Sequence, residues 1–180
     1  MTIARTIVYS INHRFFNLSL QDLHKKAFNR FLKGTSFKFV EVQVKKFLKE
    51  DFHRYIYYPA FFRLRRAQHE GHHTVMLSNS PSFIVGPIAE YLGMSSWGGS
   101  EYQLNTQGVF DSVKSILEGE GKAKRLKLLA KQLKTKMEYV TAYSDSPLDL
   151  PFLKAAGKAV VVNPTRKMQK ISRKHLWETI

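Results

Sequence analysis

Residues 139–156 read Tyr-Val-Thr-Ala-Tyr-Ser-Asp-Ser-Pro-Leu-Asp-Leu-Pro-Phe-Leu-Lys-Ala-Ala. The run Tyr139–Tyr143 predicts a strand, and the Ser-Asp-Ser-Pro turn after it leads into a helix that ends near Ala156. A strand followed directly by a helix is the unit from which parallel α/β sheets are built. Such sheets bind ligands at the carboxyl ends of their strands, which is where Asp145 falls.

The same pattern occurs at two other places in the chain. The run Thr74–Leu77 predicts a strand that ends in Ser-Asn-Ser-Pro before a helix over Ser82–Leu92. Ala159–Val162 predicts a third strand, which ends at Asn163-Pro164. Strands that alternate with helices in this way indicate an α/β fold with a Rossmann-like parallel sheet.

The rest of the chain reads as helices and one hairpin. We expect helices from Leu20 to before Gly34, over Phe37–Asp51, from Pro59 to His69 and from Gly119 to Leu133, and a hairpin of Glu101–Asn105 with Gly108–Val113. Arg166–Lys174 reads as a basic tail. These elements predict two parts, a helical cap segment over residues 1–58 and an α/β core over residues 59–180.

Composition excludes several classes of protein. The chain has 180 residues, of which 43% are hydrophobic and 24% charged, and this is typical of a globular protein. No apolar run approaches the ~18 residues of a membrane span, and Thr6–Ile11 is too short for a secretory signal. The absence of cysteine excludes disulfides, thiolate zinc sites and cysteine nucleophiles. We therefore expect a cytoplasmic protein.

The net charge of +15 is concentrated at the two ends of the sequence. Residues 1–60 carry 11 basic and 4 acidic residues, residues 61–120 carry 4 and 6, and residues 121–180 carry 14 and 4. Such a surface attracts nucleic acid or anionic lipid at low salt. The sequence contains no named nucleic-acid-binding motif, so a solvated basic surface is the simpler interpretation.

Two groups of polar residues could handle a phosphate and a metal ion. Asp145 at a strand tip and Asp149 in the next helical turn could both face one point, and carboxylate oxygens suit Mg²⁺. The alternative is that Asp145 caps the helix and Asp149 complements its N-terminus. Ser78 offers a hydroxyl, and the backbone N–H groups of Asn79 and Ser80 could bind a phosphate. Lys122 could add a positive charge, although a surface lysine is the simpler reading.

Taken together, these segments resemble the haloacid dehalogenase-like phosphatases. They are residues 75–81, 119–126, 142–153 and 159–164, and the resemblance is greatest to the phosphoserine-phosphatase-like branch with an early helical cap. The resemblance implies Mg²⁺-dependent transfer of a phosphoryl group from a small phosphorylated substrate through an aspartyl-phosphate. It further implies that Ser78 and Asn79 bind the phosphoryl group and that Lys122 neutralises it. Asp145 would bind Mg²⁺, and Asp149 would support the site.

The chain departs from this family at its first motif. The family carries an apolar strand that ends in Asp-x-Asp and supplies the nucleophile, and no Asp-x-Asp occurs in residues 1–180. That strand lies in the middle of the family's sheet, so we expect a gap in the sheet and no activity from the chain as it stands. The nucleophile would then lie upstream of Met1. The alternatives are an inactive remnant of the fold or a basic protein that associates with nucleic acid or membranes.

Two other motifs are candidates for different chemistry. His69-Glu70-Gly71-His72-His73 matches His-Glu-x-x-His, the zinc signature of many metalloproteases, which requires both outer histidines on one helical face. Gly71 and the strand from Thr74 favour a surface turn instead. A phosphate-binding P-loop fails because Ile116 stands five residues before Gly121, where this motif needs glycine.

Overall fold

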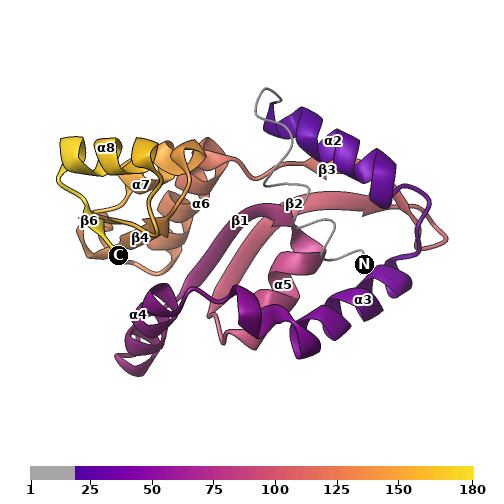
Figure 1. Cartoon of the computed structure of the whole chain (residues 1–180), viewed down its shortest axis with the longest axis horizontal. Helices are drawn as coiled ribbons and strands as arrows, with labels where there is room; N and C mark the ends of the chain where they lie inside the picture. Colours follow the sequence, from indigo (N-terminus) through magenta and orange to yellow (C-terminus); the bar gives the residue numbers. More distant parts are fainter. Residues whose placement is uncertain (1–18) are drawn as a thin grey trace. The chain divides into compact units, whose positions relative to one another are not determined.

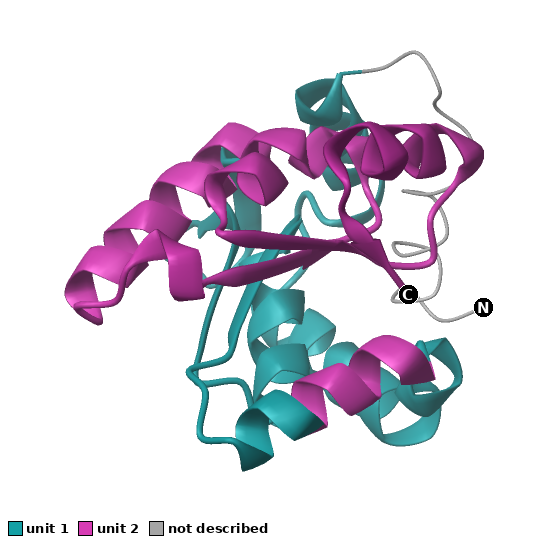
Figure 2. Cartoon of the chain, turned by 90° about the vertical axis from the view of Figure 1, so that its left-hand side faces the viewer, with its two compact units in different colours: residues 1–57, 66–117 teal, residues 58–65, 118–180 magenta. Residues whose placement is uncertain are grey.

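The structure is a computed structural model that describes residues 19–180. The apolar run Thr6–Ile11 therefore lies outside the described residues. The chain divides into two compact units, which Figure 2 shows in different colours. Unit 1 contains residues 1–57 and 66–117, and unit 2 contains residues 58–65 and 118–180. Within the described part, no helix is long and apolar enough to cross a membrane.

Unit 1 contains a three-stranded sheet with the order β1-β2-β3 (Figure 1). Its strands are β1 (Val75–Pro81), β2 (Ser96–Leu104) and β3 (Phe110–Ser115). The first part of β2 pairs with β1 in parallel, and the second part forms an antiparallel hairpin with β3. The predicted hairpin is thus confirmed, and β2 joins it to the parallel part of the sheet.

The helices of unit 1 pack against this sheet. They are α2 (Leu20–Phe31), α3 (Phe37–Glu50), the short 3₁₀ helix η1 (Phe52–Tyr55) and α5 (Ser82–Tyr91). The Ser19 hydroxyl caps α2 by accepting a hydrogen bond of 3.1 Å from the backbone N–H of Asp22. Phe28 of α2, Val44 of α3 and Phe110 of β3 belong to one buried cluster. The N-terminal helices therefore share a core with the hairpin, and the role of residues 1–58 as a cap stays a prediction.

Helix α4 (Tyr58–His69) has Pro59 in its first turn, as the sequence predicts. Tyr58–Arg65 belongs to unit 2, whereas the remainder belongs to unit 1. The helix ends at His69, and Gly71 with a φ of 74° turns the chain toward β1. No residue of α4 is buried.

Unit 2 contains a parallel sheet with the order β4-β5-β6. Its elements are α6 (Gly119–Gln132), η2 (Met137–Tyr139), β4 (Thr141–Ser144), η3 (Pro147–Asp149), α7 (Leu150–Ala155), β5 (Lys158–Val161), α8 (Arg166–His175) and β6 (Glu178–Thr179). Ala142 and Ala159 of the sheet, Leu153 of α7 and Met168 of α8 form one buried cluster. Helices α7 and α8 therefore cover the same face of this sheet, as Figures 1 and 2 show.

The segment Arg166–Lys174 corrects the prediction of a basic tail, because it lies within helix α8. The Thr165 hydroxyl caps this helix by accepting a hydrogen bond of 3.3 Å from the N–H of Met168. Met168 and Ser172 are buried and lie four residues apart, so they share one face of the helix. This short buried face is hard to recognise in a sequence dominated by lysine and arginine.

Strands β1 and β2 also differ from the prediction. β1 extends through the expected turn to Pro81, but its register with β2 shifts between Leu77 and Pro81. β2 begins at Ser96 rather than Glu101. Gly99 has no side chain and therefore lets this part of β2 lie close to the backbone of β1 at Ser80. A Cβ at Gly99 would lie 2.9 Å from the carbonyl oxygen of Ser80. Glycine is depleted in strands, so the sequence hides this part of β2.

Strands β1 and β4 each have one open edge in their own sheet. Among residues 19–180, β1 pairs only with β2 and β4 pairs only with β5. The central first strand expected from the family resemblance is therefore absent from the described residues. Open strand edges leave backbone N–H and C=O groups available for pairing with another strand.

Candidate functional site

A buried polar cluster in unit 2 joins Lys122, Asp149 and Ser144. Nζ of Lys122 lies 2.8 Å from Oδ1 and 2.9 Å from Oδ2 of Asp149. The Ser144 hydroxyl donates a hydrogen bond of 2.8 Å to Oδ2 of the same carboxylate. The exposed fractions of the Lys122 and Asp149 side chains are only 6% and 12%. The carboxylate thus holds the lysine in one place and is itself held by the serine.

The turn after β4 fixes the position of Asp149. The backbone N–H of Ser146 donates to the Ser144 hydroxyl at 3.1 Å, and the Ser146 hydroxyl accepts from the N–H of Leu148 at 3.2 Å. Ser146, rather than Asp145, is therefore the cap of η3. Asp149 is the last residue of this short helix, and its carboxylate contacts Nζ of Lys122.

The first turn of α6 brings Lys122 to this carboxylate. The helix begins at Gly119, where a Cβ atom would overlap the carbonyl oxygen of Leu148 in the turn before Asp149. Only glycine permits this approach of α6 to the turn. Lys122 follows three residues later and is fully inside the helix, with its N–H bonded to the carbonyl of Glu118 at 2.7 Å.

Asp145 and Asp149 lie in different environments, although their spacing in the sequence predicts that both carboxylates could face one point. Asp149 is buried against Lys122, whereas Asp145 is exposed at the carboxyl end of β4. Asp145 has no hydrogen-bond or ion-pair partner among residues 19–180, so its oxygens remain available to a cation. The described residues contain no group of three or more His, Asp or Glu side chains that could hold a metal ion. Asp145 fits Mg²⁺ as a single carboxylate ligand, with water or residues from outside this range completing the shell.

In unit 1, Ser78 and Asn79 lie in the irregular part of β1. The Ser78 hydroxyl accepts a hydrogen bond of 3.1 Å from the N–H of Ser80, so this N–H group is already used and is not available for a phosphate. The hydroxyl proton of Ser78 can still be donated to a ligand. The hydroxyl of Ser100 donates to the Asn79 carbonyl at 2.6 Å and accepts from the N–H of Leu117 at 3.0 Å.

Sequence reasoning missed two residues that organise these segments. Ser144 was detectable, since alternation along β4 places it on the same covered face as Ala142. Ser100, which is fully buried, was not detectable because it follows Gly98-Gly99 in a stretch without a strand pattern. Ser144 donates to the Asp149 carboxylate and Ser100 donates to the Asn79 carbonyl, so each serine positions a predicted site residue.

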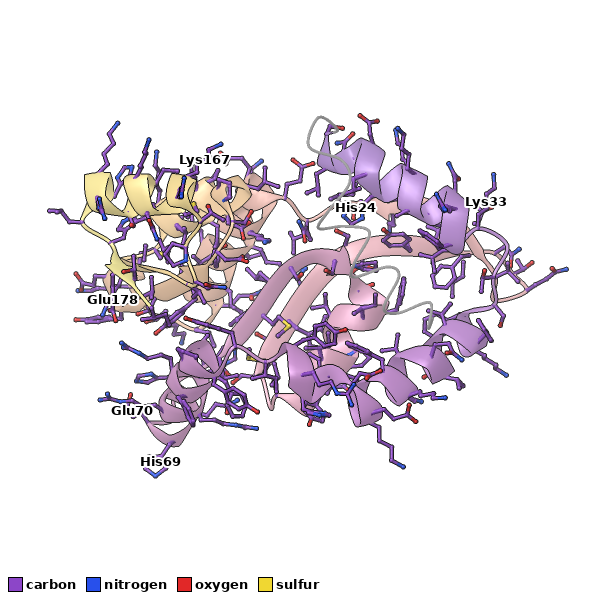
Figure 3. All side chains as sticks on the ribbon, viewed as in Figure 1. His24, Lys33, His69, Glu70, Lys167 and Glu178 are labelled. Atoms are coloured by element: carbon purple, nitrogen blue, oxygen red, sulfur yellow. The ribbon has the colours of Figure 1, made fainter. Side chains whose placement is uncertain are left out.

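The zinc interpretation of His69-Glu70-Gly71-His72-His73 is wrong. Helix α4 ends at His69, and Figure 3 shows His69 and Glu70 at this end. Glu70 accepts a hydrogen bond of 2.8 Å from Nε of Arg66, while Nε2 of His73 lies 3.1 Å from the Ser96 hydroxyl. The two outer histidines therefore do not share a helical face, and the predicted surface turn is confirmed.

Comparison with known proteins gives a family match. Residues 4–154 match the haloacid dehalogenase-like hydrolase family. The chain is 36% identical over 110 residues to a probable phosphatase of Mycobacterium tuberculosis, covering 61% of this chain and 38% of that protein. It is 32% identical over 110 residues to the phosphoserine phosphatase SerB1 of the same organism, covering 60% of this chain and 35% of that protein. The chain therefore spans little more than a third of the length of these relatives.

Solved structures share the fold at low sequence identity. A Bordetella pertussis protein of unknown function superposes with a TM-score of 0.79 at 18% identity, over 97% of this chain and 78% of that one. A substrate-bound phosphoserine phosphatase superposes with a TM-score of 0.68 at 17% identity, over 92% of this chain and 75% of that one. These similarities support the predicted Rossmann-like fold.

Proposed function

Because the chain belongs to the haloacid dehalogenase-like hydrolase family, we propose that it carries the phosphate-handling part of a Mg²⁺-dependent phosphatase. The observation that carries this proposal is the buried ion pair of Lys122 and Asp149 directly after a parallel strand. Phosphoryl transfer depends mainly on positioning and on neutralisation of charge. A lysine that is held in place before the substrate arrives supplies both at no further cost of ordering.

Lys122 would neutralise the phosphoryl oxygens. Its ammonium group has three N–H donors, and the two oxygens of Asp149 accept two of them. Among residues 19–180 the third donor has no partner, so it is available to a phosphate oxygen. Asp149 acts by holding Lys122 in this orientation, and Ser144 acts by holding Asp149.

Ser78 would bind the phosphoryl group, as the family resemblance implies. Its hydroxyl accepts from Ser80 and retains a proton to donate, and the Asn79 backbone adjoins it. Ser100 anchors the Asn79 carbonyl and thereby fixes this stretch of β1. Asp145 would bind Mg²⁺, which when present lowers the negative charge of the phosphoryl group.

The nucleophile would come from outside residues 1–180. In the reaction that the family resemblance implies, a carboxylate oxygen attacks phosphorus, the bond to the substrate alcohol breaks, and the alcohol takes a proton. Water then hydrolyses the aspartyl-phosphate and releases inorganic phosphate. Since the sequence contains no Asp-x-Asp, we place this carboxylate on a strand that would pair with the open edge of β1 or β4.

The test compares the chain of 180 residues with a chain extended by its upstream reading frame through an Asp-x-Asp segment. With Mg²⁺ and a generic phosphomonoester, we expect turnover only from the extended chain. Lys122→Ala in the extended chain should lower kcat by about 10²–10³-fold. The matched control is Lys124→Ala, two residues along the same helix and exposed, which should leave kcat unchanged. Circular dichroism melting of both variants separates loss of chemistry from loss of fold.

Three results would contradict the proposal. Turnover by residues 1–180 alone that Asp145→Asn abolishes would mean that the nucleophile lies within this chain. An extended, folded chain whose kcat changes less than about threefold on Lys122→Ala would remove Lys122 from the site. If the extended chain folds and has no turnover, the inactive-remnant alternative is the correct one.

A further inference from the structure

Helix α8 presents a continuous cationic surface that the proposed phosphatase chemistry does not use. The exposed cationic residues are Arg166, Lys167, Lys170, Arg173 and Lys174. Figure 3 labels Lys167 on this helix. None of the five forms an ion pair with a residue of the described range 19–180, and α8 itself contains no acidic residue. Glu178, the next acid along the chain, is already paired with Lys158 at 2.7 Å and Arg63 at 2.6 Å.

A leucine two residues after the last of these cations is almost completely exposed. Leu176 is 93% exposed, which is the largest exposure among the large hydrophobic side chains of the described residues. It occupies the left-handed backbone region, with a φ of 55° and a ψ of 35°, where glycine is strongly preferred. Two shallow depressions of about 480 and 660 Å³ flank it, and both are lined in part by Trp177.

We propose that α8 and Leu176 form a docking surface for an anionic lipid bilayer. The five cations would bind the phosphate groups of the lipid headgroups. Leu176 would enter the boundary between headgroups and acyl chains, where an exposed leucine loses contact with water. The buried side of α8, with Met168 and Ser172, stays packed on the sheet, so the helix adsorbs to the membrane and does not insert.

The observations favour lipid over nucleic acid. Both ligands would attract the cations, but only a bilayer rewards an exposed aliphatic side chain. Nucleic-acid surfaces commonly use exposed aromatic rings that stack on bases. Trp177 is half-buried, and its ring is already stacked on that of His175 with the centroids 4.6 Å apart. This docking surface stands independently of the proposed enzymatic activity.

The test measures co-sedimentation of the chain with lipid vesicles. We expect binding to vesicles of phosphatidylcholine mixed with phosphatidylglycerol, weaker binding as salt is raised, and no binding to phosphatidylcholine alone. The triple variant K167E/K170E/K174E should lower the affinity by at least about 100-fold. The matched control K38E/K46E/K49E makes the same change of net charge on the exposed side of α3 in unit 1 and should lower it by no more than about threefold.

Leu176→Gly tests the apolar anchor without removing a charge. Glycine suits the left-handed backbone, so the variant should melt no lower than the natural chain while its affinity for the mixed vesicles falls about fivefold. Three results would overturn the proposal: equal losses in the two triple variants, unchanged affinity in Leu176→Gly, or α8-dependent binding of a duplex DNA or RNA probe without vesicle binding. The last result would make α8 a nucleic-acid surface.

Discussion

Lys122 and Asp149 form a bidentate ion pair that is largely buried, with N···O distances of 2.8 and 2.9 Å. The residues lie 27 positions apart in the sequence, on α6 and at the end of η3. Because the pair is buried, each charge is largely without hydrating water and is compensated by the charge of its partner. Loss of either partner would leave an uncompensated charge in the core of unit 2. Lys122 therefore has two roles: its ion pair stabilises unit 2, and its ammonium group would neutralise the phosphoryl group in the proposed reaction.

Lys122→Met should destabilise the chain by about 3–5 kcal/mol, because it leaves the Asp149 carboxylate buried without a counter-charge. The double variant Lys122→Met/Asp149→Leu should recover most of this loss, since no uncompensated charge remains. Urea unfolding of the natural chain, both single variants and the double variant measures the coupling. The control is the exposed pair of Lys45 and Glu41, with side chains 69% and 41% exposed. Lys45→Met should cost no more than about 0.5 kcal/mol. Additive losses at Lys122 and Asp149 would contradict the coupling.

Gly119→Ala should destabilise unit 2 by about 1–3 kcal/mol or more, because the new methyl group would clash with the backbone carbonyl of Leu148. The neighbouring exposed substitution Glu120→Ala serves as the control and should be close to neutral. Thermal melts of the two variants decide the matter, and equal melting temperatures would show that α6 does not approach this turn so closely.

Leu176→Gly should stabilise the folded chain by about 0.5–1 kcal/mol, since a leucine at a φ of 55° carries steric strain that glycine avoids. The contrasting variant is Leu133→Gly at the end of α6, where φ is −80°. There glycine relieves no strain and should destabilise by a similar amount. Urea unfolding that shifts both variants in the same direction would rule out the left-handed strain.

The stability of unit 1 should depend on pH through His24. This side chain is buried on α2, with Nδ1 2.6 Å from the hydroxyl of Tyr102, and burial lowers the pKa of its imidazole below the ordinary 6.5. Burial also raises the pKa of the Tyr102 hydroxyl, so the tyrosine stays neutral throughout this range. The unfolded chain therefore binds a proton first as the pH falls. The full contribution of His24 to stability is present above about pH 6.5. As the pH falls from there to the lowered pKa of His24 in the folded chain, the free energy of unfolding decreases by up to about 1.4 kcal/mol per pH unit.

His24→Gln should flatten this acid-side loss of stability, whereas the exposed His53→Gln should leave it in place. Urea unfolding at a series of pH values between about 5 and 8 makes the comparison. If the natural chain and His24→Gln lose stability in parallel, protonation of His24 is not the cause.

Several elements follow from the sequence because their cause is local. Ser19 caps α2 and Pro59 lies in the first turn of α4, so residues at the helix starts determine where these two helices begin. The alternation of strands and helices after Gly71 predicts the parallel α/β fold by itself. The Asp145-to-Asp149 spacing marks the segment that holds the buried pair, although it does not reveal which of the two carboxylates is buried.

The tertiary structure decided what depends on contacts between distant segments. Asp149 rather than Asp145 is buried because η3 turns it toward Lys122, and this requires the close approach at Gly119. The first part of β2 forms a strand despite Gly98-Gly99 because β1 pairs with it, and Arg166–His175 forms a helix because Met168 enters the core of unit 2. A sequence pattern records the preferences of neighbouring residues, whereas burial of a charge or of one methionine depends on partners that only the folded chain brings near.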